Sequence, residues 1–253
     1  MSIKGVFFDL VGTLLIYGDM TSELSEWQSE FYRCLQKHGL SLSKETFIEH
    51  CNDVMVFNKN IQNPAGNLTI FECRIESLCS DLGVSIEVQD IKDISTALVY
   101  IWSKYLPLDP DCIPMLEILR QNKTLALISN FDHPPYVYDT VTKFGIKEYF
   151  KTIIVSSDVG IKKPDPGIFH LALQRTGLQP EEVVYIGDTD DDIQGSLSAG
   201  ITPILIQRKQ TETNVPARYS VDENPVLPPF PSVKNLEDVK IISSLSELTD
   251  ILE

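Results

Sequence analysis

The sequence lacks the cysteine patterns that mark zinc clusters and disulfide frameworks. Its five cysteines form no CxxC pair and follow no regular spacing, so a zinc cluster is unsupported. An odd number of scattered cysteines is typical of buried free thiols in a reducing compartment. We therefore expect thiols rather than disulfides.

Positive charge is also scarce. Lysine and arginine number 21 against 36 aspartates and glutamates, which gives a formal net charge of -15. Such a surface repels phosphate backbones and anionic membrane surfaces, so we expect neither nucleic acid nor a membrane as a partner. A small phosphate ester is still compatible with this charge, because a metal ion and a few fixed donors can set the local field.

Long apolar runs are missing as well. No segment approaches the length of a membrane span. The apolar run over residues 5–15 is interrupted by Asp9, so no signal peptide is predicted and a cytoplasmic location is expected. The chain has 253 residues and 43% hydrophobic content, which is enough for a core domain plus an insertion.

Short apolar runs are present, and they alternate with helical segments. The first, Val6-Phe7-Phe8, ends at Asp9, and further strands are predicted at 124–130, 152–157, 183–188 and 202–207. A last short strand and helix are predicted in 240–253. Strands that alternate with helices in this way are typical of βαβ units, and continuous apolar strands are typical of a parallel sheet covered on both faces. The sequence therefore predicts an α/β fold with a doubly wound parallel sheet.

Residues 17–106 interrupt this pattern. Apolar residues recur there at helical spacing, with helices predicted near 24–38, 45–58, 68–82 and 88–105 and a loop at 60–67. No strand signal is found in this stretch. We therefore divide the chain into a core of residues 1–16 plus 107–253 and an all-helical insertion of residues 17–106. Within the core, the proline-rich stretch 209–235 is predicted to be a loop.

Polar side chains follow the predicted strands where each one ends. Asp9 follows the first strand, Ser129 and Asn130 the second, Lys163 the third, and Asp188 the fourth. Because ligands bind beyond the carboxyl ends of an open parallel sheet, these groups should converge on one rim. Each alone is common turn or helix-cap chemistry, but that explanation does not account for all of them at successive strand ends.

Four strings in the chain resemble, in order, the motifs of the haloacid dehalogenase superfamily. They are DLVGTL, LALISN, KKPDPGIF and YIGDTDDDIQGSLSAG. The resemblance covers residues 1–15 and about 108–205, and the helical insertion resembles the mobile C1 cap of subfamily I by position and helicity. It implies a Rossmann-like core, a helical cap domain and a Mg²⁺-dependent hydrolase.

By this resemblance, Asp9 is the nucleophile. Its carboxylate would attack phosphorus in line and form an aspartyl-phosphate that water then cleaves. Mg²⁺ would be held by the Asp9 side chain, the Val11 backbone carbonyl and the Asp188 carboxylate, which are the hard oxygen ligands that this ion prefers.

The resemblance also implies roles for the other motif residues. The transferring phosphoryl oxygens would be bound by Ser129 and by the amides of Asn130 or Thr13, and Lys163 would neutralise developing charge. Asp192 would orient Lys163 or a metal-bound water, with Asp191 as the second candidate for that task.

Val11 departs from the family's phosphatase pattern. Phosphatases of the family usually carry at this position a second Asp, which protonates the leaving group and later activates water. Such acid–base help is typically worth about a hundredfold to ten-thousandfold, so its loss should penalise poor leaving groups. Asp132 and His133, just after the second motif, are candidates for a substitute acid.

Other functions stay open at this stage. Phosphonatases of the family carry a small apolar residue here and keep Mg²⁺, but they need a cap lysine, for which Lys37, Lys44 and Lys59 are candidates. Haloacid dehalogenases carry Tyr here and lack the Gly-Asp of the fourth motif that this sequence retains. A non-catalytic protein that binds phosphate or a partner is a further alternative, because the chain resembles an uncharacterised branch with similar D-x-V-G-T and SNFD strings.

The leading hypothesis is a Mg²⁺-dependent phosphatase that acts on a small phosphorylated metabolite, as a monomer or homodimer.

Overall fold

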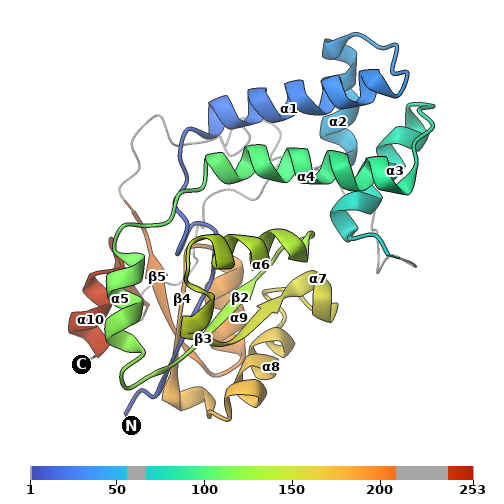
Figure 1. Ribbon diagram of the computed structural model, residues 1–253. Coiled ribbons are helices and arrows are strands. Elements are labelled where there is room, and N and C mark those ends of the chain that lie inside the picture. Colours follow the sequence, from blue (N-terminus) through green and yellow to red (C-terminus); the bar gives the residue numbers. More distant parts are fainter. Residues whose placement is uncertain (1, 56–66, 209–238, 253) are drawn as a thin grey trace. The chain divides into compact units, whose positions relative to one another are not determined.

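The computed structural model describes residues 2–55, 67–208 and 239–252, which form two compact units (Figure 1). The first unit contains residues 2–17, 106–208 and 239–252, and the second contains residues 18–55 and 67–105. Most of the predicted loop at 60–67 and all of the one at 209–235 lie outside the described residues.

The first unit is built on a six-stranded parallel sheet with the strand order β3-β2-β1-β4-β5-β6. The predicted doubly wound α/β sheet with a helical insert between its first two strands is therefore confirmed. The strands are β1 (Gly5–Phe8), β2 (Thr124–Ser129), β3 (Phe150–Val155), β4 (Val183–Gly187), β5 (Thr202–Ile206) and β6 (Lys240–Ile242).

Helices cover both faces of this sheet (Figure 1). They are α5 (Cys112–Leu119), α6 (Pro134–Lys143), α7 (Ser156–Val159), α8 (Pro166–Thr176), α9 (Asp190–Ser198) and α10 (Glu247–Leu252), with short 3₁₀ turns at Lys147–Tyr149 and Pro180–Glu182. The chain runs outward from β1 to β3 and then returns to β4 and β5. Because parallel crossovers are right-handed, this reversal places α5 and α6 on one face and α8 and α9 on the other.

Buried side chains hold α8 against the sheet. Phe169 of α8 packs edge-on against Tyr185 of β4, with ring centroids 4.9 Å apart, within a cluster that also contains Phe7 and Ala172. The side chains of a strand alternate between the two faces, so Phe7 points toward α8 while Val6 and Phe8 point to the opposite face. All three are fully buried, as expected for a central strand of a covered sheet.

The second unit contains only helices among its described residues. These are α1 (Met20–Lys37), α2 (Lys44–Met55), α3 (Ile70–Asp81) and α4 (Val88–Lys104). Asp19 caps α1, and a capping box formed by Thr69 and Glu72 starts α3. Their apolar faces meet in a core of their own, in which the Phe31 ring lies 5.4 Å from that of Phe47.

The third strand is shorter at its carboxyl end than predicted. Ser156 and Ser157 begin α7 instead of extending β3. Their hydroxyls bond the backbone of the loop after β2: the Phe131 N–H donates to Ser156 Oγ, and Ser157 Oγ donates to the Phe131 carbonyl. These bonds hold in place the loop that carries Asn130.

Among the described helices, none combines the length and the apolar character that a membrane crossing requires.

Gly195 sets how closely α9 approaches the loop before α8. A Cβ at this position would lie 2.6 Å from Phe169 Cε2 and 3.0 Å from the Pro164 carbonyl oxygen. Alanine favours a helix by about 1 kcal/mol over glycine, but overpacking a core typically costs about 1–3 kcal/mol, and here one obstacle is backbone. We therefore expect Gly195→Ala to lower the free energy of unfolding in urea denaturation. Gln194→Ala, an exposed neighbour, is the control, and an equal effect of the two substitutions would contradict this packing role.

Candidate active site

The site lies beside β1, where the order in which the chain adds strands to the sheet reverses. β1 is flanked by β2 and β4, and Phe8 is in register with both Leu127 and Ile186. Asp9 and Asp188 therefore leave neighbouring strands at the same edge, and the Asp9 N–H donates to the Ile186 carbonyl at 2.9 Å. Such a switch point is where open α/β sheets bind ligands.

Gly12 allows the loop after β1 to approach Asp188. Its φ is +89°, which favours glycine. An added Cβ would lie 2.1 Å from Asp188 Oδ2. The GT pair of the first motif thus combines a left-handed turn with the absence of a side chain, and Thr13 Oγ1 reaches Asp188 Oδ1 at 3.4 Å.

Lys163 is the buried centre of the site, with only 3% of its surface exposed. Its ammonium lies 2.6 Å from both Asp9 Oδ1 and Asp192 Oδ1, 3.0 Å from the Tyr185 hydroxyl and 3.2 Å from the Ile128 carbonyl. These four acceptors surround the three protons of one ammonium. The motif lysine therefore bridges the ends of β1, β2 and β4 and the start of α9.

Both carboxylate oxygens of Asp192 accept hydrogen bonds from groups around Lys163 and at the start of α9. Its Oδ1 accepts hydrogen bonds from Lys163 and from Tyr185, the latter at 2.9 Å. Its Oδ2 accepts from the Thr189 hydroxyl at 2.6 Å and from the backbone N–H groups of Asp188 and Thr189. The residue is completely buried at the third position of α9, where it completes the capping box of that helix.

Burial and charge shift the titration of these groups. Burial raises the pKa of Asp9, the Lys163 ammonium lowers it and the Asp192 charge raises it, and the resulting pKa is about 6. Loss of hydration raises the pKa of Asp188 well above its ordinary range, and repulsion from Asp9 and Asp192 raises it further. Burial alone would lower the pKa of Lys163, but the charges of Asp192 and Asp9 outweigh it and raise that pKa, so the ammonium stays protonated.

The site has the composition of a divalent-cation site. One carboxylate oxygen from each of Asp9, Asp188 and Asp192 lies within 4.8 Å of the others. Among the described residues, these three form the cluster of metal-ligating side chains that is close enough to share one ion. Three carboxylates against the single ammonium of Lys163 leave two negative charges uncompensated when all are ionised. Because the oxygens of Asp192 already accept several bonds, Asp9 and Asp188 are the better ligands.

Ser129 and Asn130 occupy the end of β2. Ser129 is buried, and the hydrogen bonds described for the chain include none from its hydroxyl. The Asn130 side chain is occupied with the Lys163 backbone: its amide donates to the Lys163 carbonyl, and the Lys163 N–H donates to its oxygen, each at 2.9 Å. The Asn130 side chain therefore fixes the lysine loop.

The remaining sequence candidates occupy varied positions in the two units. Asp191 is exposed on α9, and the described bonds of Lys163 go to Asp192 instead. Val11 is half-buried in the loop after β1, and His133 is buried at the start of α6. Among the cap lysines, Lys44 donates to the Ser29 hydroxyl at 2.7 Å, and Lys59 lies outside the described residues.

Sequence reasoning missed Tyr185, Arg208 and Asp109. Tyr185 looks like a core aromatic in a strand, and burial together with the Asp192 and Asp9 charges raises its pKa well above 10.0, so it remains a neutral hydroxyl. Arg208 follows β5 and pairs with Asp109 at 2.6 Å. One signal was available for Arg208, because it stands at the carboxyl end of a strand as the motif residues do.

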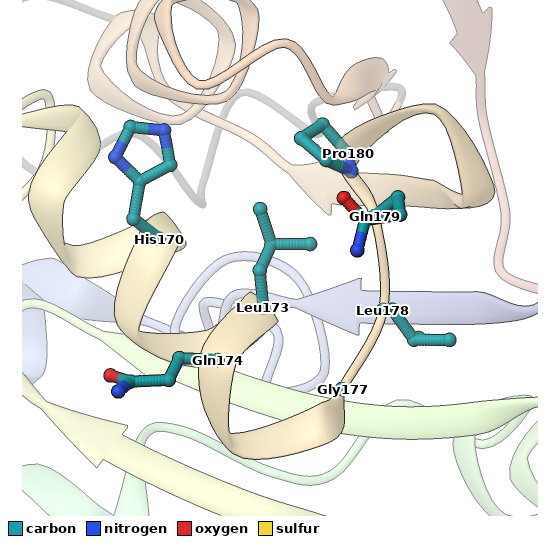
Figure 2. A pocket seen from close by; sticks show the side chains of 7 residues that line it. All are labelled: His170, Leu173, Gln174, Gly177, Leu178, Gln179 and Pro180. Atoms are coloured by element: carbon teal, nitrogen blue, oxygen red, sulfur yellow. The ribbon is translucent and has the colours of Figure 1, made fainter.

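A separate hollow of about 300 Å³ lies at the end of α8 (Figure 2). Its lining includes His170, Leu173 and Pro180, and also Leu178, whose Cδ1 would lie 2.4 Å from a Cβ at Gly5. Gly5 begins β1, so this hollow is at the amino edge of the sheet, opposite Asp9 and Asp188. It is not part of the acidic site.

The chain is similar to proteins of known family and name. A family model described as haloacid dehalogenase-like hydrolase matches residues 3–200. A glyceraldehyde 3-phosphate phosphatase of Methanopyrus kandleri is 37% identical over 107 residues, which are 41% of this chain and 45% of that protein. The chain thus matches less than half the length of this relative. An N-acylneuraminate-9-phosphatase of Rattus norvegicus is 27% identical over 79% of this chain and 80% of its own.

The fold is shared with solved structures. A 2-haloacid dehalogenase from Pseudomonas syringae superposes with a TM-score of 0.63 and 24% identity, over 99% of this chain and 98% of its own.

Asp9 should make the stability of the metal-free protein depend on pH. Its pKa is raised from 3.8 to about 6, so the folded state binds its proton more tightly than the unfolded state does. Keeping Asp9 ionised in the folded state therefore destabilises the protein. This destabilisation is absent below the pKa of the unfolded state and complete above the pKa of the folded state. The Asp9→Asn variant lacks this destabilisation. We therefore expect the difference in free energy of unfolding, variant minus wild type, to increase by roughly 1–3 kcal/mol as the pH rises from about 4 to about 7.

Urea denaturation without divalent cations measures this difference. Asp139→Asn, which removes an exposed carboxylate of α6, controls for the loss of one negative charge from an acidic chain. A difference for Asp9→Asn that stays constant over this pH range would contradict the raised pKa.

Proposed function

Because the chain belongs to the haloacid dehalogenase-like hydrolase family, we propose that it is a Mg²⁺-dependent phosphatase of small phosphorylated metabolites with Asp9 as its nucleophile. The single observation that carries this proposal is the cluster in which carboxylate oxygens of Asp9 and Asp188 lie within 4.8 Å of each other, while Lys163, itself bonded to Asp192, binds Asp9.

Asp9 is suited to nucleophilic attack. With a pKa of about 6, its carboxylate is mostly ionised at neutral pH. Lys163 bonds Oδ1, which leaves Oδ2 for attack on phosphorus. The attack would break the bond to the leaving oxygen and form an aspartyl-phosphate on Asp9, and water would then release phosphate.

The residues of the site fit a magnesium ion. Hard carboxylate oxygens from Asp9 and Asp188, together with the Val11 carbonyl, would hold it. The uncompensated negative charge described above also favours a divalent cation. When bound, this ion would reduce the repulsion between the anionic nucleophile and an anionic substrate.

The other motif residues would bind the phosphoryl group. Lys163 is protonated and can neutralise charge that develops on the phosphoryl oxygens. The Ser129 hydroxyl and the Thr13 amide are the proposed donors to these oxygens. Asp192 and Tyr185 would act through Lys163, because they hold its ammonium in place.

Val11 bears on the choice of substrate. An isopropyl side chain can neither donate nor accept a proton, so the leaving oxygen would depart without help from this position. We therefore propose that the enzyme favours esters with good leaving groups. Two similar proteins carry the names of phosphatases of small phosphorylated compounds, which supports a metabolite as the substrate class.

The helical second unit, at the family's C1 cap position, would control access to the site. We propose residues 17–106 as this cap domain.

Asp9→Asn should abolish turnover without unfolding the protein. The amide cannot form an acyl-phosphate, and loss of a nucleophile typically lowers the rate by at least about a thousandfold. Hydrolysis of an aryl phosphate with and without Mg²⁺ measures the rate, and circular dichroism checks the fold. Asp139→Asn should retain wild-type activity. Turnover by Asp9→Asn would remove Asp9 as the nucleophile, whereas a wild type that is stabilised by Mg²⁺ and phosphate but inactive would indicate a binding protein.

Val11→Asp should increase kcat/KM for alkyl phosphates. General acid–base help contributes about a hundredfold to ten-thousandfold, so even a poorly aligned carboxyl should give at least about a tenfold gain. Aryl phosphates should change little, because their leaving groups need less protonation. Val11→Asn, which is polar but supplies no acid, is the matched control. Equal effects on alkyl and aryl substrates would show that leaving-group protonation is not limiting.

A further inference from the structure

Arg208 holds the loop after β1 from a distant part of the chain. Its guanidinium donates to the carbonyl oxygens of Gly12 and Thr13, the latter at 2.6 Å. It also bonds Asp109 Oδ2 through two nitrogens, at 3.1 and 2.6 Å. One side chain thus joins the carboxyl end of β5 to the loop that follows Asp9.

Asp109 ties this clamp back to the same loop. Its backbone N–H donates to the Leu14 carbonyl at 2.9 Å, and its Oδ1 accepts from the Asp111 N–H at 2.8 Å. Three successive carbonyls, those of Gly12, Thr13 and Leu14, are therefore held by Arg208 and Asp109. Asp109 is buried, while the Arg208 side chain is 25% exposed.

The direction of these carbonyls determines the direction of an amide. In a trans peptide the C=O of one residue and the N–H of the next point to opposite sides. Because Arg208 binds the Gly12 carbonyl, the Thr13 N–H points away from the guanidinium. No described hydrogen bond uses this N–H. A cation at the carbonyl oxygen also polarises the peptide and strengthens its N–H as a donor.

We propose that Arg208, anchored by Asp109, is a positioning residue that presents the Thr13 amide to the anionic oxygens of the phosphoryl group. The inference rests on the proposed function, because it assigns to this loop a phosphate-binding task. The planar fork of arginine suits it, because separate nitrogens of one rigid group reach the Gly12 and Thr13 carbonyls and the Asp109 carboxylate.

Orthophosphate binding at saturating Mg²⁺, measured by isothermal titration calorimetry, tests this role without depending on turnover. We expect Arg208→Ala to weaken orthophosphate binding by about tenfold or more, as loss of a charge-assisted contact typically does. Added guanidinium ion, well below denaturing concentration, should restore much of the affinity. Arg208→Lys should lie between the wild type and Arg208→Ala. Arg120→Gln, which breaks an exposed ion pair with Glu117 on α5, is the matched control.

Several results would overturn the inference. They are wild-type orthophosphate affinity in Arg208→Ala, an equal loss in Arg120→Gln, or no orthophosphate binding by the wild type. Should Arg208→Ala fail to fold, Arg208→Lys carries the test, and unchanged binding in that variant overturns the inference. A wild type that binds orthophosphate through Arg208 but hydrolyses no aryl phosphate would contradict only the phosphatase proposal.

Discussion

The site depends on the burial of one ammonium. An unpaired charge at the position of Lys163 would cost several kcal/mol, so its neighbours have to supply acceptors on every side. Asp9, Asp192, Tyr185 and the Ile128 carbonyl do so. Because these groups come from different strands and a helix, satisfying one lysine aligns the ends of three strands with the start of α9.

Because Lys163 must be paired, the three carboxylates have different roles. Asp192 is saturated by Lys163, Tyr185, Thr189 and two backbone amides, so it acts as a support. Within the described residues, Lys163 bonds one oxygen of Asp9, and the hydrogen bond to the Asp188 carboxylate is a long one from Thr13. Burial raises the pKa of both groups, and repulsion from neighbouring carboxylates raises it further. The remaining negative charge is what suits the site to a cation and, with it, to a phosphate ester.

Much of the fold could be predicted, because its signals are local. Apolar runs such as Val6-Phe7-Phe8 and the helical spacing of Phe31 and Leu35 depend only on neighbours in the sequence. The end of β3 could not be located in this way, since Ser156 and Ser157 are compatible with either a strand or a helix start. Tyr185 resembled an ordinary core aromatic, and the link from Arg208 to Gly12 spans 196 residues. Neither the bond of Tyr185 to Lys163 nor that of Arg208 to Gly12 produces a periodic pattern in the sequence.

The sequence by itself determined the alternation of strands and helices, the helical insertion and the polar residues that end each strand. These follow from hydrophobic period, turn chemistry and motif order. Only the tertiary structure decided that Asp192 rather than Asp191 pairs with Lys163. It also decided that the Asn130 side chain binds the backbone of Lys163 and that Arg208 binds the loop after β1. The physical reason is that a hydrogen bond is specified by distance and direction in space, and residues of equal chemistry, such as Asp191 and Asp192, are separated only by the side of the helix on which each one lies.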